Sequence, residues 1–251
     1  MATSTTGASV GRGPQLLGQT VVVIGGSAGI GLETARLARG EGAEVVLTGR
    51  NPERLEQAAR DVEARSSAAF DANDFASLES FFQALATPID HVMVTAGAPH
   101  YANPLEMAPE EARHDLADHL LQALEVARHA AGKLRPGGAL LLVGGTGGRR
   151  IARGLEIINS VTAAMPALTA SLALELAPVR VNLIAPGFVD TPLSASLLGD
   201  DLDRRRDELR ATLPIGRVVG PADVAALAVH LMTNTAITGA TYDIDGGQQL
   251  L

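Results

Sequence analysis

The strongest constraint on the fold is an alternation of short apolar runs with longer segments of helical period. The runs are TVVVIG, AEVVLTG, AAFDA, DHVMVTAG, GALLLVGG, VRVNLIAPG and TYDIDGG. Amphipathic stretches separate most of them, at 29–40, 53–64, 74–85, 109–131 and 221–232. This order predicts an α/β fold of the Rossmann type, a doubly wound parallel sheet of seven strands between two helical layers. Ligands of such sheets bind outside the carboxyl ends of the strands.

Composition narrows the class of protein further. The 251 residues suit one domain, expected at 15–251 behind a flexible tail at 1–14. A net charge of −8 argues against a nucleic-acid surface. The absence of cysteine excludes disulfides and thiolate chemistry, and no metal site is expected. No secretory leader and no apolar run near the length of a membrane span is apparent, so a cytoplasmic protein is expected.

The loop after the first run has the character of a phosphate cradle. Gly25 permits a tight turn, and glycines further along let a pyrophosphate approach the start of a helix closely. The loop follows a predicted strand and opens a predicted helix, the context in which a glycine triplet is informative. A glycine-rich turn without a ligand is the alternative. The expected cofactor contacts here are Gly25, Ser27, Ala28, Gly29, Ile30 and Gly31.

The end of the second run indicates which dinucleotide binds. An NAD site usually places a carboxylate there for the ribose 2′-hydroxyl, but this chain has Gly49 followed by Arg50 and Asn51. A guanidinium suits a 2′-phosphate, so NADP(H) is favoured over NAD(H), with Arg50 and Asn51 as contacts. Alternatively, Arg50 is a surface arginine that caps the next helix.

Several further motifs resemble the short-chain dehydrogenase/reductase family, from about residue 17 to residue 248. FDAND resembles the segment whose acid binds adenine, VTAG resembles the family's Asn-Ala-Gly motif with Thr95 in place of asparagine, and VRVNLIAPGFVDTP resembles the segment that holds the nicotinamide carboxamide. The resemblance implies cofactor contacts at Asp71, Ala72, Ala96, Gly97, Pro186, Gly187, Val189 and Thr191.

The resemblance fails at the catalytic positions. The family uses a serine, a tyrosine, a lysine four residues after the tyrosine, and a helix asparagine. An ungapped match back from Glu175 places Ile158 and Thr162 at the tyrosine and lysine positions. Counting from the fifth run places Gly145 at the serine position, and His119 falls near the position of the asparagine. The only lysine, Lys133, precedes the fifth run and is expected at the opposite edge of the sheet. Weak candidates for a replacement acid are His100, Tyr101 and Thr146, for each of which a pocket-lining role is the alternative.

Three functions remain open from the sequence. The first is an atypical NADP(H)-dependent oxidoreductase that acts on a small apolar substrate without the tyrosine–lysine relay. An iminium or a conjugated alkene would need that relay least, because no alkoxide has to be protonated. The second is a non-catalytic NADP(H)-binding sensor or subunit, and the third is a cyclase or isomerase that reuses the pocket.

Other features have two interpretations each. Arg149, Arg150 and Arg153 could receive an anion or be solvated, and 199–211 could be a flap or a solvated helix. Pocket apolarity is expected from Pro99, Leu155, Ile158, Phe188 and Leu193. A homodimer or homotetramer through the helices near 109–131 and 154–177 is implied by the family resemblance.

Overall fold

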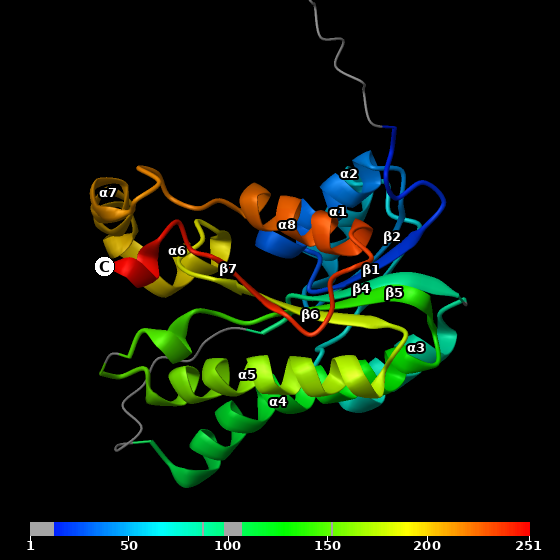
Figure 1. The fold of residues 1–251 in the computed structure, drawn as a ribbon, viewed down its shortest axis with the longest axis horizontal. Coiled ribbons are helices and arrows are strands. Elements are labelled where there is room, and N and C mark those ends of the chain that lie inside the picture. Colours follow the sequence, from blue (N-terminus) through cyan, green and yellow to red (C-terminus); the bar gives the residue numbers. More distant parts are fainter. Residues whose placement is uncertain (1–12, 87, 98–106, 152) are drawn as a thin grey trace, which may run out of the picture.

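The computed structural model describes residues 13–86, 88–97, 107–151 and 153–251 (Figure 1). Its centre is a seven-stranded sheet in the order β3-β2-β1-β4-β5-β6-β7, and every neighbouring pair is parallel. The predicted doubly wound fold is therefore confirmed. The strands are β1 (Thr20–Ile24), β2 (Glu44–Gly49), β3 (Ser66–Ala69), β4 (Ile89–Val94), β5 (Leu134–Val143), β6 (Arg180–Pro186) and β7 (Thr241–Ile244).

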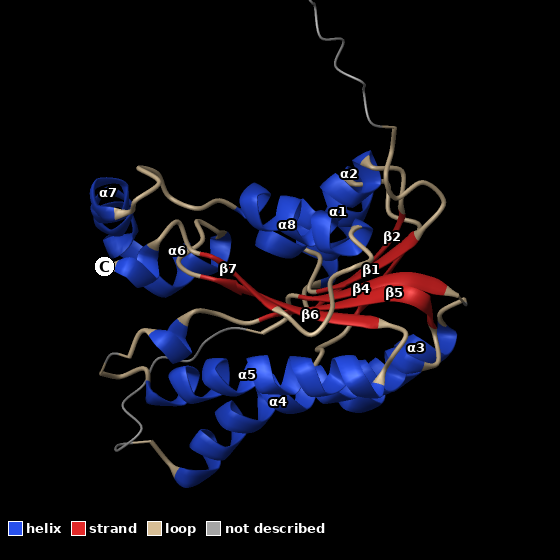
Figure 2. Ribbon diagram, in the orientation of Figure 1, coloured by secondary structure: helices blue, strands red, loops and turns tan. Residues whose placement is uncertain are grey.

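Helices cover both faces of the sheet (Figure 2). One layer contains α1 (Gly29–Gly40), α2 (Pro52–Asp61) and α8 (Pro221–Thr233). The other contains α3 (Phe75–Ala84), α4 (Pro109–Ala131) and α5 (Glu156–Glu175). Beyond the carboxyl ends of the strands, at the left in Figure 1, lie α6 (Pro192–Leu198), α7 (Leu202–Thr212) and the short helices η1 (Gly147–Arg149), η2 (Gly199–Asp201) and η3 (Gln248–Leu250).

The sheet divides the core into two apolar clusters because successive strand residues point to opposite faces. In β1, Val22 and Ile24 pack with α3, α4 and α5, whereas Val21 and Val23 pack with α1, α2 and α8. All four side chains are fully buried. Central strands buried on both faces explain the uninterrupted apolar runs of the sequence.

Two strand boundaries differ from the sequence expectation. β3 ends at Ala69, before the FDA segment, and lies at the exposed edge of the sheet. β5 begins at Leu134, earlier than expected, because a register shift between Ile89 and His91 lets it pair before the GALLLV run. Gly138 lies at this irregularity, where a Cβ would collide with the Asp90 carbonyl oxygen.

Helix α5 corrects one expectation about membranes. By length and mean hydropathy alone, 1.5 over its best window, α5 could span a bilayer, although no run was expected to come near this. In the structure α5 lies in a helical layer against β6 and beside α4. Val161, Met165 and Leu172 of α5 contribute to the core.

Candidate cofactor cleft and reaction site

The loop between β1 and α1 has the shape that its glycines predict. Gly25 has a φ of +94° and Gly29 a φ of +54°, which are left-handed conformations that favour glycine. A Cβ on Gly31 would lie 2.5 Å from Thr95 Oγ1, so helix and loop approach more closely than another residue would allow. This is the close packing of helix against strand that the last glycine of a dinucleotide-binding loop permits.

Thr95 holds this loop from the neighbouring strand. Its hydroxyl lies 3.2 Å from the Ile24 carbonyl oxygen and 3.0 Å from the Gly25 carbonyl oxygen, and it donates to this pair. The backbone N–H of Ala96 also donates to Ile24 O, at 3.0 Å. Thr95, which stands where the family motif has asparagine, therefore fixes the turn. Gly97 lies two residues after Thr95. Its φ is +122°, and a Cβ there would have no atom within 4 Å.

The first turn of α1 is able to receive an anion. Its N-cap, Ala28, has no side chain that could accept from the first N–H groups of the helix. Such N–H groups and the helix dipole attract phosphate. A Cβ on Gly29 would lie 3.4 Å from Thr191 Cβ, so this end of the helix faces the loop after β6. The predicted contacts Gly29 and Thr191 thus lie close together.

The end of β2 leaves no room for the carboxylate of an NAD site. A Cβ on Gly49 would lie 2.9 Å from Ser27 Oγ and 3.1 Å from Ser27 Cβ. Arg50 extends into solvent, with its side chain 70% exposed, and its guanidinium lies 3.9 Å from the Asp71 carboxylate. Asn51, not Arg50, caps α2, because its side-chain oxygen accepts from Arg54 N at 2.8 Å.

The predicted adenine side of the cleft comes after β3. Asp71 is exposed, and its carboxylate accepts from the backbone N–H of Asn73 at 3.0 Å. Ala72 is buried beneath it. Asn73 in turn donates to Asp118 of α4 at 2.9 Å and accepts from Gln122 at 2.7 Å. This network links the loop after β3 to α4.

The Pro186-Gly187 turn is held by the end of the chain. The side-chain oxygen of Gln248 accepts from Phe188 N at 2.9 Å, and a Cβ on Gly187 would lie 2.5 Å from that oxygen. Val189 is buried and bridges to Val219. Thr191 begins α6 in a reciprocal capping arrangement with Ser194. The loop that the family resemblance assigns to the nicotinamide is therefore rigidly supported.

The residues matched to the missing serine and lysine do lie together. A Cβ on Gly145 would lie 3.5 Å from Thr162 Cγ2 and 3.7 Å from Pro186 O. The Thr162 hydroxyl donates within its own helix, 2.7 Å from Ile158 O and 3.1 Å from Asn159 O. It is therefore engaged and does not replace an ammonium. Lys133 lies at the far edge, where its ammonium donates to Leu85 O at 3.2 Å.

The other candidate residues lie in two different places. Thr146 is buried beside the Pro186 turn, and its N–H donates to Pro186 O at 3.1 Å. His119 of α4 and Ile158 of α5 line a cavity of about 10 Å³, with Asp115, Ile157 and Val161. The Nδ1 atom of His119 is buried without a partner there. His100, Tyr101 and Pro99 lie outside the described residues.

Asn159 is a buried polar residue near these positions that the sequence did not single out. Its side chain is only 4% exposed, and neither Oδ1 nor Nδ2 has a hydrogen-bond partner. It lies on α5 between Ile158 and Thr162, and a Cβ on Gly147 would be 2.9 Å from its Oδ1. One sequence signal was available. Asn159 is the only amide in a mostly apolar helix and precedes Thr162 by three residues, which places both on one face.

Helix α7 is tied to the loop after β6 by an ion pair. Arg206 of α7 makes a two-pronged ion pair with Asp190, with Nε–Oδ2 at 2.9 Å and Nη2–Oδ1 at 2.8 Å. This pair raises the pKa of the guanidinium. The guanidinium groups of Arg205, Arg204 and Arg150 together lower the pKa of Glu208, the hydrogen bond from Arg205 most strongly. Arg150 belongs to the loop after β5, so the charge of that loop also acts on α7.

One arginine of the cluster after β5 is already engaged in hydrogen bonds and an ion pair within the protein. Arg149 donates through Nε to Gln249 at 2.7 Å and also pairs with Asp243 of β7. It anchors η1 to the carboxyl terminus and is not available as the anion receptor that the sequence suggested. Arg153 is exposed.

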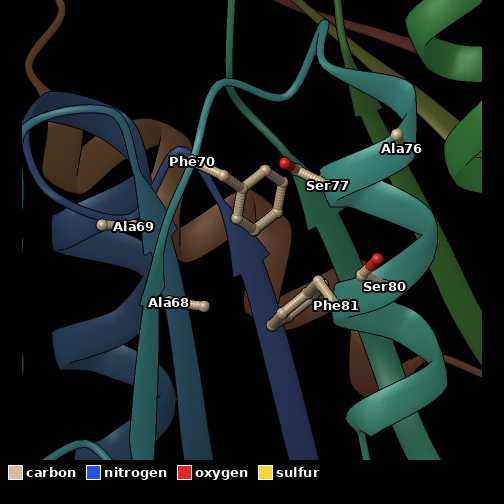
Figure 3. Close-up of a pocket in the computed structure, with 7 residues that line it drawn as sticks. All are labelled: Ala68, Ala69, Phe70, Ala76, Ser77, Ser80 and Phe81. Atoms are coloured by element: carbon tan, nitrogen blue, oxygen red, sulfur yellow. The ribbon is translucent and has the colours of Figure 1, made fainter.

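A separate hollow of about 450 Å³ lies away from these residues, between β3 and α3. Figure 3 shows Phe70 and Ser77 facing each other across it, with Phe81 below. It is open to solvent and lined mostly by alanine and serine. No residue of the cofactor loop or of the β5 loop borders it.

These features define a Rossmann-type protein with the cradle of a dinucleotide-binding site. The family model described as enoyl-(acyl carrier protein) reductase matches residues 25–249. The chain belongs to the short-chain dehydrogenase/reductase family, which is a family of oxidoreductases.

Similar proteins span nearly the whole chain. The short-chain dehydrogenase/reductase ATR9 of Stachybotrys chlorohalonatus is 30% identical, over 93% of this chain and 98% of its own. A small-chain dehydrogenase in complex with NADPH is 29% identical with a TM-score of 0.79, covering 93% of this chain and 99% of that one. The MalC reductase/Diels-Alderase of Malbranchea aurantiaca is 26% identical in structural alignment, with a TM-score of 0.89 and coverage of 95% and 99%.

Proposed function

We propose that this protein is an NADP(H)-dependent oxidoreductase that transfers hydride to a small apolar substrate without a tyrosine–lysine proton relay. The observation that carries the proposal is the pairing of a complete dinucleotide cradle with Gly145, Ile158 and Thr162 at the positions where proton transfer is usual. The bound nicotinamide would supply hydride. The chain's own residues would bind the two reactants and orient them toward each other.

The cradle residues fit a phosphorylated dinucleotide. The glycine loop and the uncapped start of α1 would hold the pyrophosphate, and Thr191 with the Pro186-Gly187 turn would orient the nicotinamide. Gly49 carries no carboxylate that would repel a 2′-phosphate, and the exposed guanidinium of Arg50 can reach one. Preference for NADP(H) is further supported by two similar structures that contain NADPH.

The residues at the usual catalytic positions favour substrates whose reduction needs no proton from a side chain of the protein. Ile158 provides a branched alkyl group where a phenol would donate, and the Thr162 hydroxyl is bonded to its own helix. General acid catalysis is worth about 10²–10⁴ in rate, so simple ketones should be poor substrates. Conjugated alkenes avoid an alkoxide, and the enoyl reductase description of the matching family model agrees with this class.

The test measures loss of the reduced nicotinamide absorbance at 340 nm with a ketone, a cyclic imine and 2-cyclohexenone. We expect the enone or the imine to be reduced at least tenfold faster than the ketone. NADPH binding without turnover of any acceptor would contradict the proposal and favour a sensor or subunit.

A second candidate is a ring-forming activity. Its support is the similar MalC protein, which is described as both a reductase and a Diels-Alderase. The apolar side chains Leu155, Ile158 and Phe188 would shape a pocket for such a reaction. Product formation from a linear diene precursor without NADPH consumption would favour this function over hydride transfer.

Cofactor choice has its own test. Arg50→Ala should weaken NADPH binding about tenfold, or about 1.4 kcal/mol, because the 2′-phosphate loses its cation. NADH has no such phosphate and should bind within twofold of wild type. The matched control is Arg54→Ala, an exposed arginine one turn into α2. Equal losses for both cofactors would contradict the assignment.

We also propose that the protein is a cytoplasmic homo-oligomer that pairs through α5. The outward positions of α5 carry no charge between Glu156 and Glu175 and include Ala163, Ala167 and Leu174, which is 81% exposed. Ala167→Arg should shift the mass measured by light scattering to that of a smaller species. An unchanged mass would exclude this face, and cell fractionation would test the compartment.

A further inference from the structure

We propose that the Asn159 carboxamide is the substrate-binding donor of this site and stabilises the oxygen of an α,β-unsaturated carbonyl during reduction. This deepens the proposed function and depends on it. In the described part of the chain, Asn159 is the one buried side chain whose polar atoms are all without partners. Burying an amide without hydrogen-bond partners costs free energy, so a folded protein rarely keeps one without a use.

The position of Asn159 fits this role. Gly147 lies over the carboxamide, between Asn159 Oδ1 at 2.9 Å and Thr162 Oγ1 at 3.0 Å from its Cβ position. Thr146, next to Gly147, is bonded to Pro186 O in the turn expected to hold the nicotinamide. Asn159 therefore lies one layer behind the reacting end of the cleft.

Access to Asn159 requires the turn at 146–149 to move outward. The two ends of this turn are tied down, Thr146 to Pro186 and Arg149 to Asp243 and Gln249. Between them lie Gly147 and Gly148, the residues whose backbone can change conformation most easily. The turn can therefore lift at its middle while its ends stay in place.

The reaction balances without an ionisable side chain. Hydride arrives at the β-carbon of the enone, the alkene pair moves to form a bond between the α-carbon and the carbonyl carbon, and the carbonyl pair moves to oxygen. Asn159 Nδ2–H donates to the enolate oxygen, as side-chain amides do in oxyanion holes. Water then protonates the α-carbon, and the hydroxide is neutralised by buffer. In sum, NADPH, the enone and a proton give NADP⁺ and the saturated ketone.

Asn159→Leu tests the role through two readouts. Removal of an oxyanion donor lowers kcat by about 10²–10³, so kcat with NADPH and 2-cyclohexenone should fall by that factor while KM changes less than threefold. In the protein without cofactor, the melting temperature should stay at or above that of wild type, because no bond is lost. Thr169→Val, a buried threonine further along α5 bonded to Met165 O, is the matched control.

Asn159→Asp separates the donor from the shape of the side chain. The carboxylate of this variant cannot donate a hydrogen bond, but the protonated carboxyl can. The activity of the variant should therefore rise as pH falls, while the activity of wild type should not depend on pH. A melting temperature of Asn159→Leu lowered by several degrees would show a structural role and overturn the inference. So would unchanged kcat. If wild type reduces no acceptor, the proposed function fails and this inference fails with it, whereas turnover in wild type with unaffected variants defeats the role of Asn159 alone.

Discussion

Two buried asparagines distinguish the supporting region of the molecule from its reactive region. Asn182 of β6 is fully buried, donates to Ile237 O at 3.0 Å and accepts from Ala240 N at 3.2 Å. Asn159 of α5 is almost as buried and has no partner at either end. The same side chain thus serves folding where its partners are built in. Where they are missing, it marks a place for a ligand.

The surroundings repeat the contrast. Beside Asn182, the guanidinium of Arg180 is buried and donates to five backbone carbonyl oxygens, including Leu231 and Met232 at the end of α8. Beside Asn159, the Thr162 hydroxyl turns back to its own helix and Gly145 offers no side chain. One region is saturated with hydrogen bonds, and the other is not.

The largest expected effect tests the saturated region. Arg180→Leu should destabilise the protein by about 3–5 kcal/mol, because it leaves several buried carbonyl oxygens without donors. The measurement is urea unfolding followed by circular dichroism. Arg204→Leu, an exposed arginine of α7, should change stability by less than about 0.5 kcal/mol. Similar effects of the two would remove the basis of the comparison.

The asparagines themselves provide the next test. Asn182→Leu should cost about 2–3 kcal/mol, since two partly buried backbone groups lose their bonds. Asn159→Leu should be neutral or should stabilise by up to about 1 kcal/mol, since it replaces unpaired polar atoms with apolar ones. Both variants can be measured in one urea series without cofactor. A loss at Asn159 equal to that at Asn182 would make the two sites equivalent.

A buried histidine with only one of its two ring nitrogens hydrogen-bonded should make the stability of the protein depend on pH. His91 of β4 pairs through Nε2 with Gln19 at 2.7 Å, while its Nδ1 has no partner. Burial, and secondarily the charge of Arg180, lower the pKa of His91 to about 3 from the ordinary 6.5. The unfolded chain therefore binds the proton first as the solution is acidified. The stability that this neutral histidine provides is complete above pH 6.5 and is lost as pH falls toward 3.

Between pH 6.5 and pH 5 this amounts to about 2 kcal/mol. His91→Gln removes the titration and should flatten the dependence of unfolding free energy on pH in that window. The slope is obtained from urea unfolding at four pH values. An unchanged slope in His91→Gln would assign the dependence to other groups.

A weaker effect is expected at α7. Arg206→Gln removes the ion pairs with Asp190 and Asp203 and should change the overall stability little, because solvent screens both pairs. The expected change is local, a faster tryptic cleavage within 199–213. The control Arg210→Gln, whose pair with Asp207 is exposed, should leave the cleavage rate unchanged. Equal cleavage rates in the two variants would show that the Arg206–Asp190 pair does not hold α7 in place.

The sequence predicted those parts of the molecule that depend on local chemistry. The apolar runs predicted the sheet because buried parallel strands need them. Gly25, Gly29 and Gly31 predicted the cofactor loop because its backbone requires glycine. The position of Lys133 at the opposite edge was expected from its place before β5, and its bonds to Gln83 O and Leu85 O agree with this.

Other parts depend on contacts between distant residues. Ser27 excludes a side chain at Gly49, and Gln249 with Asp243 engages Arg149, over separations that no local pattern encodes. The unpaired state of Asn159 is likewise a property of its neighbours, and its residue type alone says nothing about it. The same holds for β3, which pairs with β2 over Ser66–Ala69 and so begins and ends earlier than the predicted run.

Thr95 has a consequence for how the cofactor is received. Thr95 follows the neighbouring strand, and its hydroxyl donates hydrogen bonds to the glycine loop. The loop should therefore lose little conformational entropy when a dinucleotide binds. Association then costs little ordering, and the affinity reflects the contacts themselves. A calorimetric titration with NADPH should accordingly show a small entropic penalty, and Thr95→Val should enlarge that penalty while the binding enthalpy stays nearly the same.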